Sequence, residues 1–151
     1  MNTETRRIAD QLRRAFSGEA WHGDAIRELL SGVTAEQARA HPLARSHNMW
    51  ELVLHIEVWA RAALEATQGV PMPRLYGTEK DWPPPAGDWN EAISTLATTG
   101  ERLTQAIEAF PDGRLEDTVP GRDYNFYYLF HGIVQHSLYH AGQIAILKAN
   151  L

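Results

Sequence analysis

Residues 88–110, DWNEAISTLATTGERLTQAIEAF, have the clearest hydrophobic periodicity in the chain. Asp88 can cap a helix at the start of this stretch, and Pro111-Asp112-Gly113 ends it. Apolar side chains recur at spacings of three, four and seven residues, which predicts an amphipathic α-helix with one buried face. These side chains are Trp89, Ile93, Leu96, Leu103, Ile107 and Phe110.

Three other long segments have the same helical periodicity. The first begins after Asn2 or Thr3 and ends near Ser17-Gly18, the second spans about 48–67, and the third about 125–149. No strand pattern competes, so the sequence predicts an all-α protein in which four long helices form a four-helix bundle. The side chains expected to face inward are Ile8, Leu12, Ala15 and Phe16 in the first segment, Leu52, Ile56, Trp59 and Ala63 in the second, and Leu129, Phe130, Ile133, Ile144, Leu147 and Leu151 in the third.

Two less regular segments connect these helices. Between the first and second long helices, an apolar cluster (Ile26, Leu29 and Leu30) and a capping box beginning at Thr34 predict short extra helices that end before His41-Pro42. Five prolines and two glycines lie between Gly69 and Asp88, a composition that cannot continue a helix. A connection of about 20 residues in a compact domain is often functional or poorly ordered.

Composition narrows the possible functions. The 151 residues fit one domain, 1–151, and the formal charge of -5 argues against nucleic acid as a partner. No apolar run is long enough for a membrane span, and the first residues are too polar for a signal peptide, so we expect a cytoplasmic location. Cysteine is absent, which excludes disulfides, thiolate ligands and a cysteine nucleophile.

The segment His136-Ser-Leu-Tyr-His140 places two imidazoles four residues apart, on nearly the same face of a helix. The buried stripe of this helix passes through His140, so both rings are expected to face the bundle interior. His131 lies five residues from His136, roughly 140° away around the helix, and is excluded as a co-ligand. This spacing suits two ligands of one metal ion.

A third ligand is expected from another helix, and His55 is the candidate because it lies on the buried stripe of the 48–67 helix. The other histidines, His22, His41 and His47, fall in irregular segments and are expected to be exposed. The alternative is three structural histidines, which would leave buried polar nitrogens to satisfy at about 1 to 3 kcal/mol each. A metal ion would satisfy all three at once.

Other residues near these positions allow more than one interpretation each. Glu51, one turn before His55, is a fourth ligand, a partner of a ligand or simply a solvated side chain. Tyr139 and Gln143 can bind a ligand or hydrogen-bond within the fold. Three tryptophans can line a pocket or belong to the core, namely Trp59, Trp82 and Trp89. Gly132 and Gly142 indicate a close approach, for helix packing or for ligand room.

Four parts of the sequence form a set that spans almost the whole chain: Met49-Trp-Glu-Leu-Val-Leu-His55-Ile, Asp81-Trp82-Pro83, Trp89, and His136-Ser-Leu-Tyr-His-Ala-Gly-Gln-Ile144. In this set the chain resembles the DinB/YfiT-like family of the DinB superfamily. The resemblance implies an up-down-down-up bundle, a zinc or nickel site on His55, His136 and His140, and frequently a homodimer. Family members with known activity include thiol S-transferases that use bacillithiol, mycothiol or glutathione, and a mycothiol-dependent isomerase. No signature of a particular thiol is present.

Three functions remain open from the sequence. In the first, the protein is a transferase whose metal activates a low-molecular-weight thiol for attack on an electrophilic small molecule. In the second, it is a hydrolase that uses metal-bound water, with Glu51 as the candidate general base. In the third, it is a non-catalytic stress or ligand-binding protein.

Overall fold

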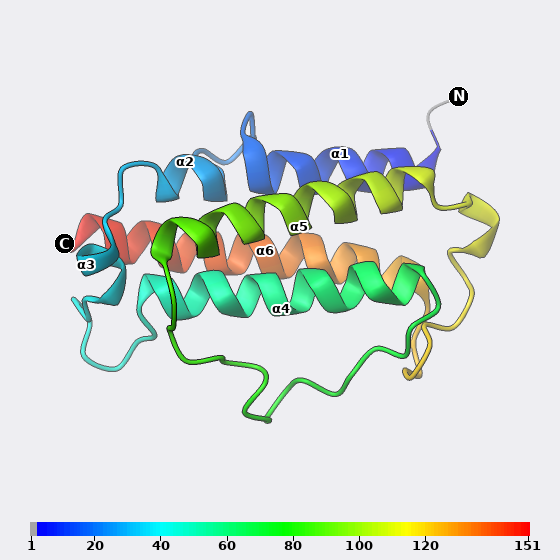
Figure 1. Cartoon of the computed structure of the whole chain (residues 1–151). Coiled ribbons are helices and arrows are strands. Elements are labelled where there is room, and N and C mark those ends of the chain that lie inside the picture. The colour runs from blue at the N-terminus through cyan, green and yellow to red at the C-terminus, as the bar shows by residue number, and fades with distance from the viewer. Residues whose placement is uncertain (1–2) are drawn as a thin grey trace.

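The computed structural model describes residues 3–151, which form six α-helices and one short 3-10 helix (Figure 1). The all-α prediction is confirmed, and two short helices lie between the first and second long helices as expected. The elements are α1 (Glu4–Ser17), α2 (Ile26–Leu30), α3 (Ala35–Arg39), α4 (Met49–Thr67), α5 (Trp89–Ala109), η1 (Asp112–Arg114) and α6 (Phe126–Ala149).

Each long helix begins at a side chain that caps it. An oxygen of the capping side chain accepts a hydrogen bond from a main-chain N–H in the first turn. The sequence indicated the cap at Asp88, and the other three helix starts were expected from periodicity. The capping residues are Thr3, Asn48, Asp88 and Asn125.

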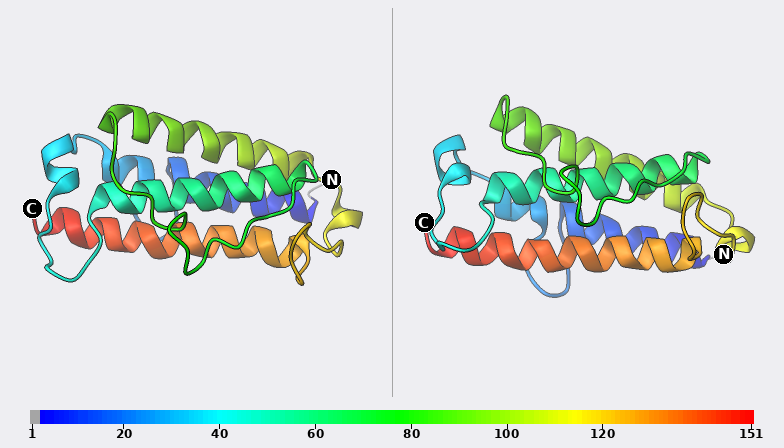
Figure 2. Two further views of the ribbon diagram at one scale, coloured as in Figure 1. Left: turned by 60° about the horizontal axis from the view of Figure 1, so that its bottom comes forward. Right: turned by 90° about the horizontal axis from the view of Figure 1, so that it is seen from below.

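The four long helices pack in a ring, in which α4 and α1 each contact both α5 and α6. Helices α1 and α6 run in one direction and α4 and α5 in the other, which is the up-down-down-up order (Figure 1). This order requires the chain to return along the bundle after α4. Residues 69–88 make that return beside α4 and α6 (Figure 2). The long connection therefore lies against the two helices that carry the three candidate histidines.

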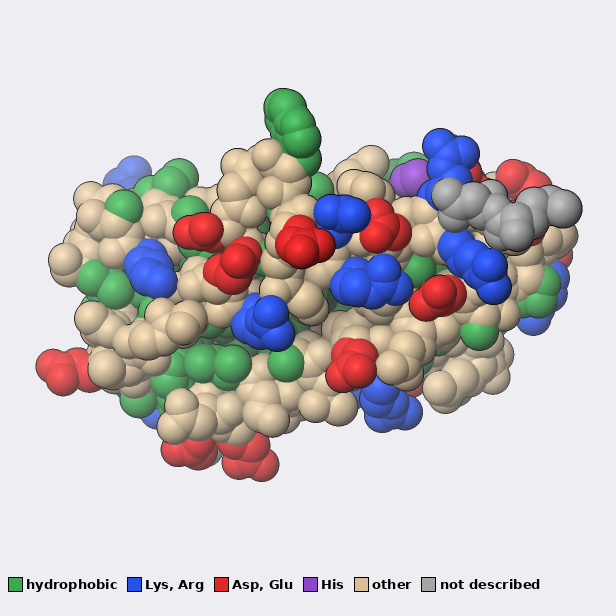
Figure 3. Space-filling model, turned by 90° about the horizontal axis from the view of Figure 1, so that it is seen from above, with side chains coloured by type: hydrophobic (Ala, Val, Ile, Leu, Met, Phe, Trp, Pro, Cys, Tyr) green, Lys and Arg blue, Asp and Glu red, His purple; other side chains and the backbone are tan. Residues whose placement is uncertain are grey.

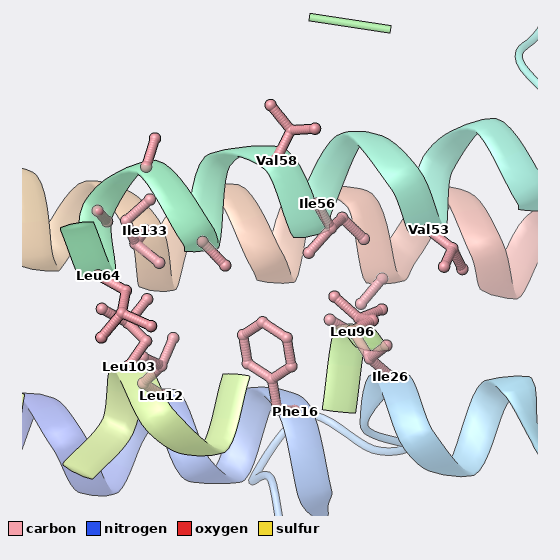
Figure 4. Close-up of a cluster of buried hydrophobic side chains, with 14 of the residues drawn as sticks. Leu12, Phe16, Ile26, Val53, Ile56, Val58, Leu64, Leu96, Leu103 and Ile133 are labelled. Carbon is pink, nitrogen blue, oxygen red and sulfur yellow. The ribbon is translucent and has the colours of Figure 1, made fainter. Parts of the chain in front are cut away.

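Side chains from all four long helices meet in the core. Phe16 of α1, Ile56 of α4, Leu103 of α5 and Ile133 of α6 are buried and point toward one another (Figure 4). The predicted inward-facing side chains are buried or partly buried, with one exception. Leu151 follows the last turn of α6 and is 48% exposed, so its assignment to the core was wrong.

Among the glycines within the helices, the close helix contact lies at Gly100 and not at Gly132 or Gly142. A Cβ atom at Gly100 would lie 2.6 Å from Cδ1 of Phe16, so α1 and α5 can pack this closely only because residue 100 is glycine. A Cβ at Gly132 or Gly142 would meet nothing within 4 Å. Helix packing at these two glycines is therefore excluded, whereas ligand room at Gly132 remains consistent with the structure.

The surface of the bundle carries charges of both signs. On the face shown in Figure 3, basic and acidic side chains are interspersed over the surface, with no large area of one sign. Within residues 3–151, no helix is long and apolar enough to cross a membrane.

Candidate metal centre

Three histidines from two antiparallel helices converge at one point. His55 comes from α4, and His136 and His140 come from successive turns of α6. One ring nitrogen from each lies within 4.8 Å of the corresponding nitrogens of the other two. Nε2 of His136 lies 2.9 Å from Nε2 of His55. The group that spacing and burial pattern predicted is therefore assembled in the fold and could hold a metal ion.

The three imidazoles are uncharged at neutral pH. His55 and His140 are each 5% exposed, and His136 lies at the edge of the buried face. Burial lowers the pKa of all three, because it disfavours the charged ring. For His136, burial and the neighbouring His140 and His55 together lower the pKa to about 3. Neutral imidazole is the form that binds metal ions.

Hydrogen bonds fix the orientation of two of the rings. Nδ1 of His55 donates to the main-chain carbonyl oxygen of Asp81 at 2.7 Å. Nδ1 of His140 donates to Oε1 of Gln143 at 2.5 Å. In both rings the proton therefore lies on Nδ1, and the lone pair of Nε2 is free to bind a metal. Gln143 therefore hydrogen-bonds within the fold, where it orients the candidate ligand His140.

Asp81 is a site residue for which the family resemblance was the only indication in the sequence. It is 4% exposed, and its Oδ1 accepts a 2.8 Å hydrogen bond from Nε1 of Trp59 and lies 3.2 Å from Nδ1 of His55. Periodicity could not place Asp81 because it lies in the irregular connection. The only available signal was the Asp81-Trp82-Pro83 string itself.

Trp82 covers the site from the same connection. Its ring stacks on His55 with centroids 3.8 Å apart and planes within 4°. The other face of Trp82 stacks on His47, with centroids 3.5 Å apart. His47 is exposed as predicted, but it has a structural contact with the site that its position in an irregular segment did not indicate.

A small pocket opens beside His136. Its volume is about 180 Å³ and its walls are mostly apolar. Gly132 forms part of the wall, which agrees with the ligand-room interpretation of this glycine. We call it the apolar pocket, and its lining residues are Trp59, Tyr124, Tyr128, Leu129, Gly132, Ile133 and His136.

Two other predicted neighbours of the site have different roles. The carboxylate of Glu51 accepts from the main-chain N–H of Asn48 and lies 3.1 Å from Nδ1 of His47. It therefore completes the cap of α4 and is not part of the histidine group that could hold a metal. Tyr139 is 68% exposed and contacts His140 through a ring edge.

Trp89 and His131 lie away from the histidine group. Trp89 is buried, donates from Nε1 to the carbonyl oxygen of Val33 and packs against Trp50, so it belongs to the core. His131 lies 3.7 Å from a carboxylate oxygen of Glu4. The exclusion of His131 as a co-ligand agrees with its absence from the group of three.

The donor set fits a divalent metal ion. Three neutral imidazoles bind zinc and other first-row metals and leave at least one coordination position for another ligand. Neither the curated proteins nor the solved structures include a match to this chain. A family model of the DinB superfamily matches residues 20–144, which include all three histidines and both short helices. With this match over most of its length, an up-down-down-up bundle and a buried group of three histidines, the chain belongs to the DinB superfamily.

Proposed function

We propose that the protein binds a divalent metal ion, zinc or nickel, on His55, His136 and His140, and uses it to activate a low-molecular-weight thiol for attack on an electrophilic small molecule. The observation that carries this proposal is the convergence of three buried, neutral imidazoles beside a pocket with apolar walls. A bound ion would supply Lewis-acid chemistry and lower the pKa of a thiol held against it.

The residues around the histidines support such a reaction by position. Asp81 and Gln143 orient His55 and His140, and Trp82 shields His55 from solvent. The apolar pocket beside His136 would hold the organic part of a substrate and exclude water. In the transfer, the thiol loses its proton to solvent, its sulfur forms a bond to the electrophilic carbon, and the leaving group departs with the bonding electron pair. Because the chain has no cysteine, the thiol comes from outside.

The hydrolase alternative has less support. A hydrolase of this type needs a general base near the metal, and Glu51 was the carboxylate considered for that role. Its carboxylate is engaged at the start of α4 with Asn48 and His47. Gln143, the polar side chain on the His140 turn, holds an imidazole and cannot take up a proton at neutral pH.

Metal content of the purified protein tests the site. We expect close to one equivalent of metal per chain, and a loss of most of it in His55→Ala and in His136→Ala. His131→Ala is the matched control, because His131 lies on the same helix as His136 but outside the group of three. Metal bound equally well by all variants, or by none of them including the unmodified protein, would reject the site.

A panel of thiols tests the reaction. We expect metal-dependent conjugation of bacillithiol, mycothiol, glutathione or cysteine to an electrophile, and loss of this activity in His136→Ala but not in His131→Ala. Metal-dependent turnover with water alone would favour the hydrolase. Metal binding without either activity would favour the non-catalytic function.

A homodimer, expected from the family resemblance, is part of the proposal. Trp21 is fully exposed at the tip of a tight turn closed by an Ala20–Gly23 bridge, and Glu19, which precedes this turn, has a φ of 59°. An indole held clear of the surface by a tight turn is the kind of side chain that a second copy would cover. Sedimentation velocity should show a dimer that dissociates in Trp21→Ala and persists in the Tyr76→Ala control. A monomer at all concentrations would exclude it.

A further inference from the structure

A second pocket adjoins the apolar pocket and contains two arginines. It has a volume of about 650 Å³ and shares Trp59 and Tyr124 with the apolar pocket. Arg74, from the connection after α4, and Arg122, from the loop before α6, lie in its wall. We call it the arginine pocket. The two pockets are therefore neighbours, one beside His136 and the other beside the two arginines.

No carboxylate pairs with either of these two arginines within residues 3–151. Arg122 donates through Nη2 to the carbonyl oxygen of Pro73, while its Nε is buried and has no hydrogen-bond partner in the described residues. Arg74 makes no hydrogen bond or ion pair there either. By contrast, the arginines at 7, 13, 14, 61 and 114 all pair with acidic side chains.

The loop that carries Arg122 is held rigidly. The main-chain N–H of Met72 donates to the carbonyl oxygen of Pro120 at 2.8 Å, which joins this loop to the connection after α4. Gly121 has a φ of 78°, and a Cβ there would lie 3.1 Å from the carbonyl oxygen of Met72. The guanidinium group of Arg122 is therefore presented by a fixed turn.

Charge indicates what the arginine pocket would bind. Two arginines and one acid, Asp123, line it, so the wall carries one net positive charge in a chain whose formal charge is -5. Burial raises the pKa of Tyr124, and the nearby Arg122 opposes this rise. A single positive charge, together with the N–H donors of Arg74, matches a monoanionic carboxylate better than a doubly charged phosphate.

We propose that Arg74 and Arg122 bind the carboxylate of a small organic substrate whose apolar part occupies the apolar pocket beside His136. This inference rests on the proposed function for the reaction at the histidines, and it adds the chemical class of the substrate. A cavity of about 150 Å³ is large enough for a benzene ring, so an aryl or short alkyl group fits the apolar pocket.

Matched pairs of ligands test this proposal without knowledge of the reaction. Metal-free protein is titrated with phenylacetate, 3-phenylpropanoate and 4-phenylbutanoate, with the amide of each acid, and with phenyl phosphate. Binding is followed through the indole N–H resonance of Trp59, assigned with Trp59→Phe. We expect saturable binding of at least one carboxylate, at least about tenfold weaker binding of its amide, and weaker binding of phenyl phosphate.

Variants assign the binding to the two arginines. Arg74→Gln and Arg122→Gln should each weaken carboxylate binding by about tenfold and leave amide binding unchanged. Arg45→Gln, an exposed arginine outside both pockets, is the matched control and should bind like the unmodified protein. Asp123→Asn should bind the carboxylate more tightly. Arg74 has no partner in the described residues, so its replacement keeps the test valid if Arg122→Gln fails to fold.

Equal affinity for acids and amides, or carboxylate binding that is unchanged in Arg74→Gln, would overturn the proposal. Tighter binding of phenyl phosphate would replace the carboxylate with a phosphate as the recognised group. Because the titration uses metal-free protein, its failure is distinct from a failure of the metal site, which is scored by the metal content of the His55 and His136 variants.

Discussion

The carbonyl oxygen of Asp81 lies 2.7 Å from Nδ1 of His55, and the carboxylate of the same residue binds the indole of Trp59. One residue of the connection after α4 thus fixes both a candidate ligand and a wall of the apolar pocket. Groups that orient metal-binding histidines in this way commonly contribute about 10- to 100-fold to metal affinity.

We therefore expect Asp81→Ala to weaken metal binding by about 10- to 100-fold, because His55 loses the nearby carboxylate and the loop loses its bond to Trp59. Competition with a chelating dye measures the affinity. The exposed Asp24→Ala should bind metal like the unmodified protein. An unchanged affinity in Asp81→Ala would mean that the carboxylate has no part in orienting His55.

Trp82 should control how quickly metal leaves the site. Its ring covers His55 on one face and is covered by His47 on the other. Trp82→Ala should release metal to a chelator about tenfold faster, because solvent then reaches His55 directly. His47→Ala is the control, since it removes the outer ring and leaves Trp82 on His55, so its release rate should change much less. Equal release rates in both variants would contradict a covering role for Trp82.

Two glycine substitutions in helices should have opposite effects on stability. Gly100→Ala places a Cβ 2.6 Å from Phe16 and should lower the free energy of unfolding by about 1 to 3 kcal/mol through overpacking. Gly142→Ala adds a Cβ in open space within α6 and should raise it by up to about 1 kcal/mol, the difference in helix propensity. Urea denaturation measures both. Phe16→Leu should recover part of the loss in Gly100→Ala, and a stabilised Gly100→Ala would contradict the packing argument.

The sequence predicted those features that depend on local periodicity. The start of α5 followed from the cap at Asp88, and the pairing of His136 with His140 followed from their spacing on α6. The residues that contact the histidines from the connection 69–88 could not be predicted, because this long connection has no periodicity. The contact of Asp81 with His55 joins residues 26 apart along the chain, and nothing in the composition of 69–88 sets that register.

The close approach at Gly100 was missed for a similar physical reason. Gly100, Gly132 and Gly142 all lie inside helices, and the sequence does not show which glycine faces a neighbouring aromatic ring. Only the relative position of α1 and α5 brings Phe16 against Gly100. Leu151 looked like the next residue of a buried stripe, but α6 ends at Ala149 and the stripe ends with it.

Asp112 gives a prediction that does not involve the metal. Its carboxylate accepts hydrogen bonds from the main-chain N–H groups of Glu4 and Thr5 and from the Thr5 hydroxyl, so η1 caps the start of α1. These bonds from Thr5 and Glu4 hold the pKa of Asp112 below its ordinary value of 3.8. Asp112→Asn should therefore be less stable than the unmodified protein at pH 7.

The pH dependence of this difference follows from the sign of the shift. Because the pKa in the folded state is the lower one, the stabilisation by Asp112 is fully present above about pH 3.8 and is lost as the pH falls through the folded-state pKa. The denaturation midpoints of the unmodified protein and Asp112→Asn should accordingly converge along an acid series, whereas the exposed Asp24→Asn should match the unmodified protein throughout. A difference of constant size from pH 7 into strong acid would show that the ionised carboxylate does not stabilise the start of α1, and that Asp112→Asn acts through packing instead.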